Sequence, residues 1–100
     1  MKAFEFLDDA KAEFLESVRH YTEVRKDLGS RFRAALLVAV NAATLSPEHG
    51  RPSEGGTRSR AVKGFPYRVV YIDEPERCLV VAVAHHKREA DYWRRRGSDC

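Results

Sequence analysis

Residues 64–93 constrain the fold of this chain more than any other stretch. Two runs rich in apolar and β-branched residues, 65–72 and 78–85, flank an Asp-Glu-Pro-Glu turn at 73–76. This arrangement predicts a β-hairpin. The second run, Leu79 to Ala84, contains no polar residue, which is typical of a central strand covered on both faces. We therefore expect the chain to be organised around this strand.

The first half of the chain predicts a short strand and two helices. Residues 2–7 alternate weakly between apolar and polar side chains, as in an edge strand. Apolar residues then recur at helical spacing from Ala10 to Tyr21 and from Phe32 to Ala43. Gly29, placed between them, is expected to end the first helix in the left-handed conformation. The short connection predicts an antiparallel helical hairpin.

A third strand of the sheet is expected after a loop. Residues 46–56 hold two prolines and three glycines and predict a loop. Residues 57–63 then alternate, with Arg58 and Arg60 on one face. The predicted fold class is α+β: an antiparallel sheet of about four strands packed against an N-terminal helical hairpin, ending in a short C-terminal helix or tail. We expect a single domain over residues 1–100.

Composition and charge argue against some classes of protein for this chain, such as membrane-spanning, secreted or metal-binding proteins. No apolar run approaches the ~20 residues of a membrane span, and Glu5 interrupts any secretory leader. Neither cysteine has metal-site spacing. A cytoplasmic protein without metal, cofactor or membrane partner is expected. Residues 1–50 carry seven Lys and Arg against eight Asp and Glu, whereas residues 51–100 carry eleven against seven. The basic half suggests an anionic partner, although a solvated charged surface explains it equally well.

Several pieces, taken in order, resemble the RelE/ParE superfamily of type II toxins. They are the hairpin with Gly29, the loop with Pro47, Gly50, Arg51 and Pro52, Arg60, Phe65-Pro66-Tyr67, Tyr71, and the run 85–93. The resemblance covers about residues 4–96. It implies a small toxin that is neutralised by a cognate antitoxin, which wraps it with an extended or helical segment.

The superfamily divides by target. RelE-like members cut messenger RNA on the ribosome, and ParE-like members poison DNA gyrase. The Phe-Pro-Tyr strand and the Tyr-Trp ending look ParE-like. The cationic set resembles the RelE type and implies five catalytic candidates: Arg58, Arg60, Arg68, Arg88 and Tyr92. We first expect a ribosome-dependent endonuclease. The alternatives are a non-enzymatic gyrase inhibitor and a non-toxic basic domain that binds RNA or protein.

The chemistry of RNA cleavage explains this choice of residues. Cations must stabilise the phosphorane while other groups transfer protons. Arg58, Arg60 and Arg68 could converge on one phosphate if their strands are neighbours in matching register. Substitution Arg68→Ala would then abolish toxicity, whereas a structural Arg68 lying along the sheet edge is the competing interpretation. His86, Lys87 and Trp93 are candidate RNA contacts, and His85 is expected to be half-buried and hydrogen-bonded.

The antitoxin contact is predicted on the second helix. Val38, Ala42 and Leu45 widen its apolar surface beyond the main stripe, so that together with a sheet edge they offer a groove for an amphipathic helix or an added strand. The same side chains could instead be core. The nuclease hypothesis depends on one geometric condition: the arginines must share a single hollow. If they do not, the gyrase or scaffold interpretation takes over.

Overall fold

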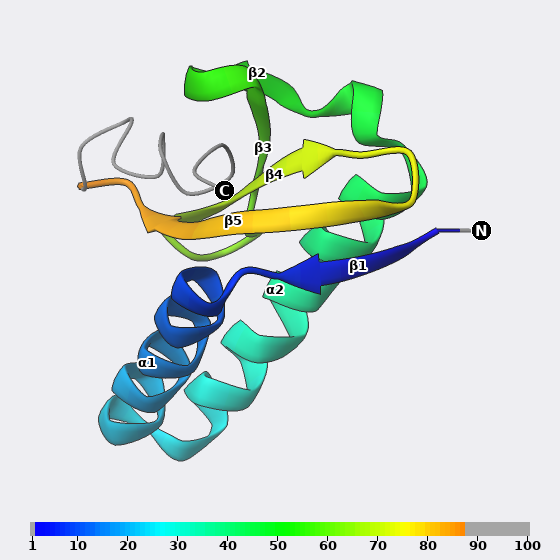
Figure 1. Ribbon diagram of the computed structural model, residues 1–100. Coiled ribbons are helices and arrows are strands. Elements are labelled where there is room, and N and C mark those ends of the chain that lie inside the picture. Colours follow the sequence, from blue (N-terminus) through cyan, green and yellow to red (C-terminus); the bar gives the residue numbers. More distant parts are fainter. Residues whose placement is uncertain (1, 88–100) are drawn as a thin grey trace.

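The computed structural model describes residues 2–87, and its architecture is a sheet with two helices on one face (Figure 1). The strands lie in the order β1-β5-β4-β3-β2. In chain order the elements are β1 (Ala3–Phe6), α1 (Asp8–Val24), α2 (Lys26–Leu45), β2 (Arg51–Ser53), β3 (Thr57–Ala61), β4 (Tyr67–Asp73) and β5 (Arg77–His85). The predicted α+β class is confirmed.

The sheet differs from the prediction in two ways. It has five strands instead of about four, because the segment predicted as a loop contains β2 and two short 3₁₀ turns, Pro47–His49 and Glu54–Gly56. In addition, β1 pairs with β5 in parallel, whereas the other pairings are antiparallel. The predicted C-terminal helix or tail falls in residues 88–100 and lies outside the described residues.

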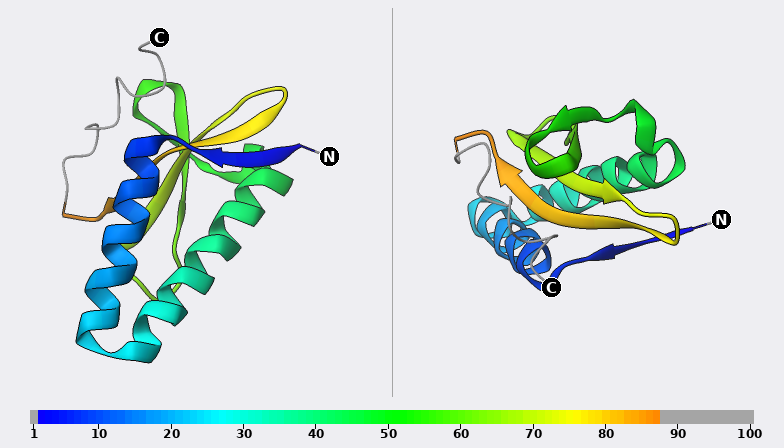
Figure 2. Two further views of the ribbon diagram at one scale, coloured as in Figure 1. Left: turned by 60° about the horizontal axis from the view of Figure 1, so that its bottom comes forward. Right: turned by 45° about the horizontal axis from the view of Figure 1, so that its top comes forward.

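The two helices form the predicted antiparallel hairpin and lie together against the sheet (Figure 2). Their boundary is not at Gly29, as predicted, but at Arg25, whose extended backbone separates α1 from α2. Gly29 lies inside α2 and is needed for close packing. A Cβ there would stand 1.9 Å from Thr22 Oγ1 and 3.1 Å from the Val18 carbonyl oxygen. Only glycine allows the first turn of α2 to approach α1 this closely.

A β-bulge in β5 decides which of its side chains face the helices. Val70 pairs with Ala82 and Tyr71 with Val80, so Val81 is the extra residue. Val80 and Val83 consequently pack in the cluster shared with the helices, whereas Leu79 packs in the cluster on the other face. Strict alternation along the strand would place Leu79 and Val83 on one face, and the bulge separates them.

The main core lies between the helices and the sheet. Phe32, Leu36 and Val40 of α2 are fully buried there, in one cluster with Ala10 of α1 and Val69 of β4. This matches the apolar stripes predicted for the two helices. Among residues 2–87, neither helix is long and apolar enough to cross a membrane.

The loop before β3 is tied to the sheet by Tyr71. This residue is fully buried, and its hydroxyl donates a hydrogen bond of 2.7 Å to the Pro47 carbonyl oxygen. Burial raises the pKa of the Tyr71 hydroxyl, and this outweighs the opposing effect of Arg60 beside it. A Cβ on Gly50 would lie 1.9 Å from the same hydroxyl oxygen. The phenol therefore fixes the path of residues 47–50 over the sheet.

Candidate functional site

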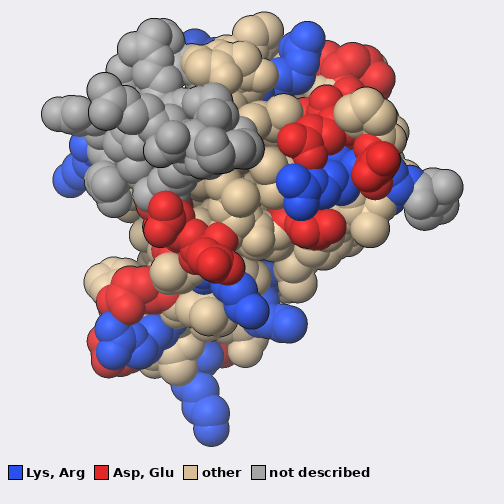
Figure 3. Space-filling view, viewed as in Figure 1, with Lys and Arg blue, Asp and Glu red and all other residues tan. Residues whose placement is uncertain are grey.

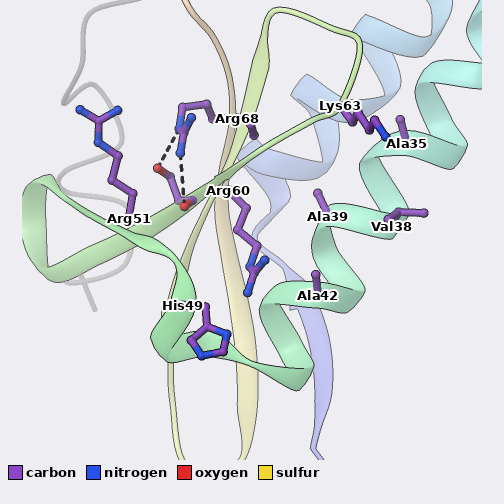
Figure 4. A pocket seen from close by; sticks show the side chains of 11 residues that line it. Ala35, Val38, Ala39, Ala42, His49, Arg51, Arg60, Lys63 and Arg68 are labelled. Atoms are coloured by element: carbon purple, nitrogen blue, oxygen red, sulfur yellow. Dashed lines mark hydrogen bonds between the residues drawn. The ribbon is translucent and has the colours of Figure 1, made fainter.

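The candidate site is a hollow of about 380 Å³ beside β3, where the open edge of this strand faces α2 (Figure 4). The α2 side is apolar and the strand side is basic. The lining residues are Ala35, Val38, Ala39, Ala42, His49, Arg51, Ser59, Arg60, Ala61, Lys63 and Arg68. None of these described lining residues is acidic. The hollow thus combines an apolar wall with four permanent cations.

Two of the predicted catalytic arginines, Arg58 and Arg60, serve the loop that precedes their strand. Arg58 Nη1 donates to the Gly50 carbonyl oxygen at 2.9 Å, and Arg60 Nη2 donates to the Ser46 carbonyl oxygen at 3.0 Å. The Ser46 carbonyl oxygen also accepts the His49 backbone N–H at 3.1 Å, so Arg60 is a second donor to it, and both guanidinium groups add charge-assisted hydrogen bonds to the segment. Both arginines therefore hold the loop.

Arg68 projects from the other face of the sheet. In the β3–β4 register Arg60 is opposite Val69, which packs towards the helices, so the adjacent Arg68 points the opposite way. Its Nε donates to Ser59 Oγ at 2.9 Å, and its Nη2 lies 3.4 Å from the Ser59 carbonyl oxygen. Figure 4 shows Arg68 and Arg60 extending to opposite sides of β3. Arg60 and Arg68 thus line the same hollow from opposite faces of the sheet, whereas Arg58 is not among its described lining residues, and the three do not converge on one phosphate-sized point.

A second cation stands beside Arg68. Arg51 of β2 pairs with Ser59 and therefore shares the face on which Arg68 lies. Burial lowers the pKa of the Arg68 guanidinium below its usual value, and the positive charge of Arg51 lowers it further. Neither arginine belongs to an ion pair within residues 2–87. Within the described residues, the outer edge of β3 is consequently a positive site without a paired carboxylate.

On the face of the molecule seen in Figure 3, opposite charges are interspersed. Figure 3 shows Lys, Arg, Asp and Glu mixed over the hairpin and around the β4–β5 turn. At that turn Lys2 pairs with Asp73, and Arg77 contacts Glu5 at 2.9 Å and Glu74 at 2.6 Å. The unpaired cations of the β3 edge therefore contrast with the paired charges of the β4–β5 turn.

The remaining candidates on β5 are placed as follows. His85 is half-buried, packs edge-on against Tyr67 with ring centroids 5.0 Å apart, and accepts the Lys87 backbone N–H at Nδ1. His86 and Lys87 are exposed. His85 is thus the hydrogen-bonded residue that we expected. Arg88, Tyr92 and Trp93 lie outside the described residues.

The residues predicted to contact the antitoxin are largely at the surface. Val38 is 68% exposed and Leu45 69% exposed, while Ala42 is partly exposed and lines the hollow beside Val38. The alternative that they form core is therefore wrong for Val38 and Leu45. Sequence reasoning missed Arg51 and Lys63. Arg51 is recognisable as part of the site only from its pairing with Ser59. That pairing requires β2, which we had predicted to be a loop.

No cluster of potential metal ligands occurs among residues 2–87. The polar side-chain groups that the described residues bring to the hollow are guanidinium, ammonium, imidazole and hydroxyl. Such a donor set suits an anionic ligand.

Comparisons with known proteins identify the family to which this chain belongs. Residues 4–90 match the model of the ParE toxin of type II toxin–antitoxin systems, parDE. Among solved structures, a chain of the chromosomal ParDE toxin–antitoxin system from P. aeruginosa superposes with a TM-score of 0.74 at 16% identity, covering 85% of this chain and 96% of that one. Curated protein sequences gave no match. The family match spans nearly the whole chain and agrees with the shared fold, so the protein belongs to the ParE family of toxins of type II toxin–antitoxin systems.

Proposed function

We propose that this toxin inhibits growth by binding DNA gyrase in the cytoplasm, without cleaving RNA, and that a cognate antitoxin neutralises it. The observation that carries the proposal is the division of the β3 and β4 arginines between two faces of the sheet. Arg58 and Arg60 bind loop carbonyls on one face, and Arg68 binds Ser59 on the other. Three members of the cationic set that suggested a nuclease therefore make other contacts in the fold, and the remaining two, Arg88 and Tyr92, lie outside the described residues.

Nuclease chemistry makes demands that Arg58, Arg60 and Arg68 do not meet in the described part of the chain. A phosphorane needs two or more cations aimed at the same oxygens, with a proton-transfer group within hydrogen-bond reach. Within residues 2–87, Nδ1 of His85 on β5 already accepts a backbone N–H. His49 lines the hollow, but there Arg60 and Arg68 extend to opposite sides of β3. The match to the ParE model, rather than to a nuclease, favours the same conclusion. Gyrase inhibition requires only a binding surface.

The antitoxin is proposed to cover the exposed apolar surface of α2. Val38, Ala42 and Leu45 lie along one side of this helix, next to the hollow at β3. Large exposed aliphatic side chains in such an arrangement are typical of a protein contact. Covering them offers roughly 25 cal/mol for each Å² of apolar surface removed from water.

Purified toxin and gyrase test the proposal directly. We expect ATP-dependent supercoiling to fall as toxin is added and to recover when antitoxin is premixed, while messages on translating ribosomes stay intact in a parallel reaction. Rapid cleavage of ribosome-bound messages with unimpaired supercoiling would refute the gyrase assignment and restore the nuclease.

A matched pair of valines tests the antitoxin surface. Val38 and Val24 are similarly exposed, at 68% and 64%, but only Val38 borders the hollow. Val38→Asp should weaken antitoxin binding about tenfold or more, equivalent to about 1.4 kcal/mol, and Val24→Asp should not. Thermal unfolding of each free toxin variant separates lost binding from lost folding. Equal effects on binding would place the antitoxin elsewhere.

A further inference from the structure

The hollow beside β3 has the size and the lining of a small-molecule site. Its volume of about 380 Å³ falls within the ~300–1,000 Å³ of typical ligand pockets. One wall is apolar and the other is basic, and the cations that line it are Arg51, Arg60, Lys63 and Arg68. A lining divided in this way fits an anion that also carries an apolar part.

The basic side of the hollow carries positive charge without paired carboxylates. None of its four cations belongs to an ion pair recorded within residues 2–87. Arg51 repels Arg68, and this repulsion adds to burial in lowering the pKa of the Arg68 guanidinium. Ser59 Oγ holds the same guanidinium at 2.9 Å from Nε, so Arg68 loses little conformational entropy when it binds an anion. An anion beside the two arginines replaces their repulsion with two attractions.

The positions of the cations fit several linked anionic groups better than one phosphate. Arg51 of β2 lies opposite Ser59 of β3, and Arg68 of β4 lies opposite Ala61. Because β3 lies between their strands, the backbones that carry the two arginines are about 10 Å apart. Arg60 lines the hollow from the other face of the sheet (Figure 4). A chain of two or three phosphates can contact cations that are spread in this way, whereas a single phosphate reaches only some of them.

One donor of Arg60 has no acceptor in the described part of the chain. Its Nη2 donates to the Ser46 carbonyl oxygen at 3.0 Å, but its Nε is buried and has no hydrogen-bond partner there. A buried donor without a partner costs free energy, and such atoms often mark the site of an ion or of a bound water. The lining of the hollow therefore holds hydrogen-bonding capacity that the fold itself does not use.

The α2 wall of the hollow presents small side chains. Ala35, Ala39 and Ala42 all line it, and their spacing of four and three residues places them on one side of the helix. Such small side chains leave a smooth surface that accepts the flat ring of a nucleobase. His49 lies at the Ala42 end of the hollow (Figure 4), and its exposed imidazole can stack on such a ring.

We propose that this hollow binds a nucleoside polyphosphate, with the base on the alanine wall of α2 and the phosphates along the edge of β3. Arg51 and Arg68 contact the phosphates from the outer face, and Arg60 and Lys63 supply further positive charge. The ligand is a small molecule bound by the free toxin. The inference therefore goes beyond the inhibition of gyrase and needs neither gyrase nor an antitoxin as a partner.

Isothermal titration calorimetry on the purified full-length toxin tests the inference, with ATP, ADP, AMP and inorganic tripolyphosphate as probes. We expect ATP to bind, AMP to bind about tenfold or more weakly because it lacks two phosphates, and tripolyphosphate to bind more weakly than ATP because it lacks the base. Arg51→Gln and Arg68→Gln should each weaken ATP binding about tenfold. Arg33→Gln, which changes an exposed arginine of α2 outside the described lining of the hollow, should alter it little. Circular dichroism of each variant checks that its fold is intact.

Each contrary result overturns a stated part of the inference. Absence of ATP binding at millimolar concentration removes the site. Equal affinities for AMP and ATP remove the phosphate contacts, and equal affinities for tripolyphosphate and ATP remove the base contact. Unchanged ATP binding by both Arg51→Gln and Arg68→Gln places the nucleotide outside the hollow. Single-stranded RNA oligonucleotides whose affinity keeps rising with length would identify an extended strand as the ligand instead of a nucleotide. Because these assays contain neither gyrase nor antitoxin, the proposed function stands or fails separately.

Discussion

Replacing Gly50 by alanine tests the claim that Tyr71 fixes the loop over the sheet. The backbone of Gly50, at φ −70° and ψ 149°, accepts alanine without strain. The space does not. A Cβ would lie 1.9 Å from the Tyr71 hydroxyl oxygen, 2.8 Å from its Cζ and 3.1 Å from Arg58 Cβ. The Tyr71 ring is fully buried, so either the ring or the loop must move.

The expected loss follows from the contacts that this movement breaks. Two hydrogen bonds depend on the close approach: Tyr71 to Pro47 at 2.7 Å and Arg58 to Gly50 at 2.9 Å. Each contributes about 1 kcal/mol, and overpacking adds about 1–3 kcal/mol. Gly50→Ala should therefore lower the free energy of unfolding by about 3–5 kcal/mol, a large part of the ~5–15 kcal/mol of a typical domain.

Urea unfolding followed by circular dichroism measures this loss, and a second glycine supplies the control. Gly64 has φ +85° and open space around its Cβ position, so Gly64→Ala should cost only about 1–2 kcal/mol of backbone strain. In the double variant Gly50→Ala/Tyr71→Phe the 1.9 Å contact is absent. Its loss of unfolding free energy should therefore be smaller than the sum of the losses of the two single variants. A Gly50→Ala variant no less stable than Gly64→Ala would refute the reasoning.

Two further predictions concern single contacts. Glu13 Oε1 accepts the Val83 N–H at 3.0 Å beyond the end of β1, so Glu13→Ala should cost about 1–3 kcal/mol in urea unfolding; an unchanged midpoint would contradict this. The raised pKa of Tyr71 means that the native state keeps this proton when the unfolded chain begins to lose it near pH ~10. Stability should thus be full below that pH and fall above it, and Tyr71→Phe should fall less steeply in unfolding curves measured between pH 8 and 11.

Local patterns were enough to predict most of the elements. The helical stripes around Phe32 and Leu36 and the unbroken apolar run of β5 depend on neighbours in sequence, and both are confirmed. The predicted helix end at Gly29 is wrong, because a glycine between two helices is compatible with either a helix end or a close helix contact. Only the distance to Thr22 distinguishes the two.

The site was harder to predict because it depends on strand register. Alternation correctly put Arg58 and Arg60 on one face, since both belong to β3. Their relation to Arg68 depends on which residue of β4 lies opposite Arg60, and that residue is Val69. Arg51 became relevant only because a segment predicted as loop forms β2. Such long-range pairing leaves little trace in a single sequence.

The arginines of this toxin also show why a growth assay alone cannot identify its functional residues. Substituting Arg58 or Arg60 removes a donor from the carbonyl of Gly50 or Ser46 and loosens the loop, so toxicity falls through stability. Substituting Arg51, which lies exposed on the opposite face, breaks no hydrogen bond recorded within the described residues. A loss of toxicity or of antitoxin binding in that variant, at unchanged unfolding free energy, therefore reports on recognition. At this edge of the sheet, arginines on one face hold the loop, and Arg51 on the other face is available for binding. The residue type alone does not distinguish the two roles.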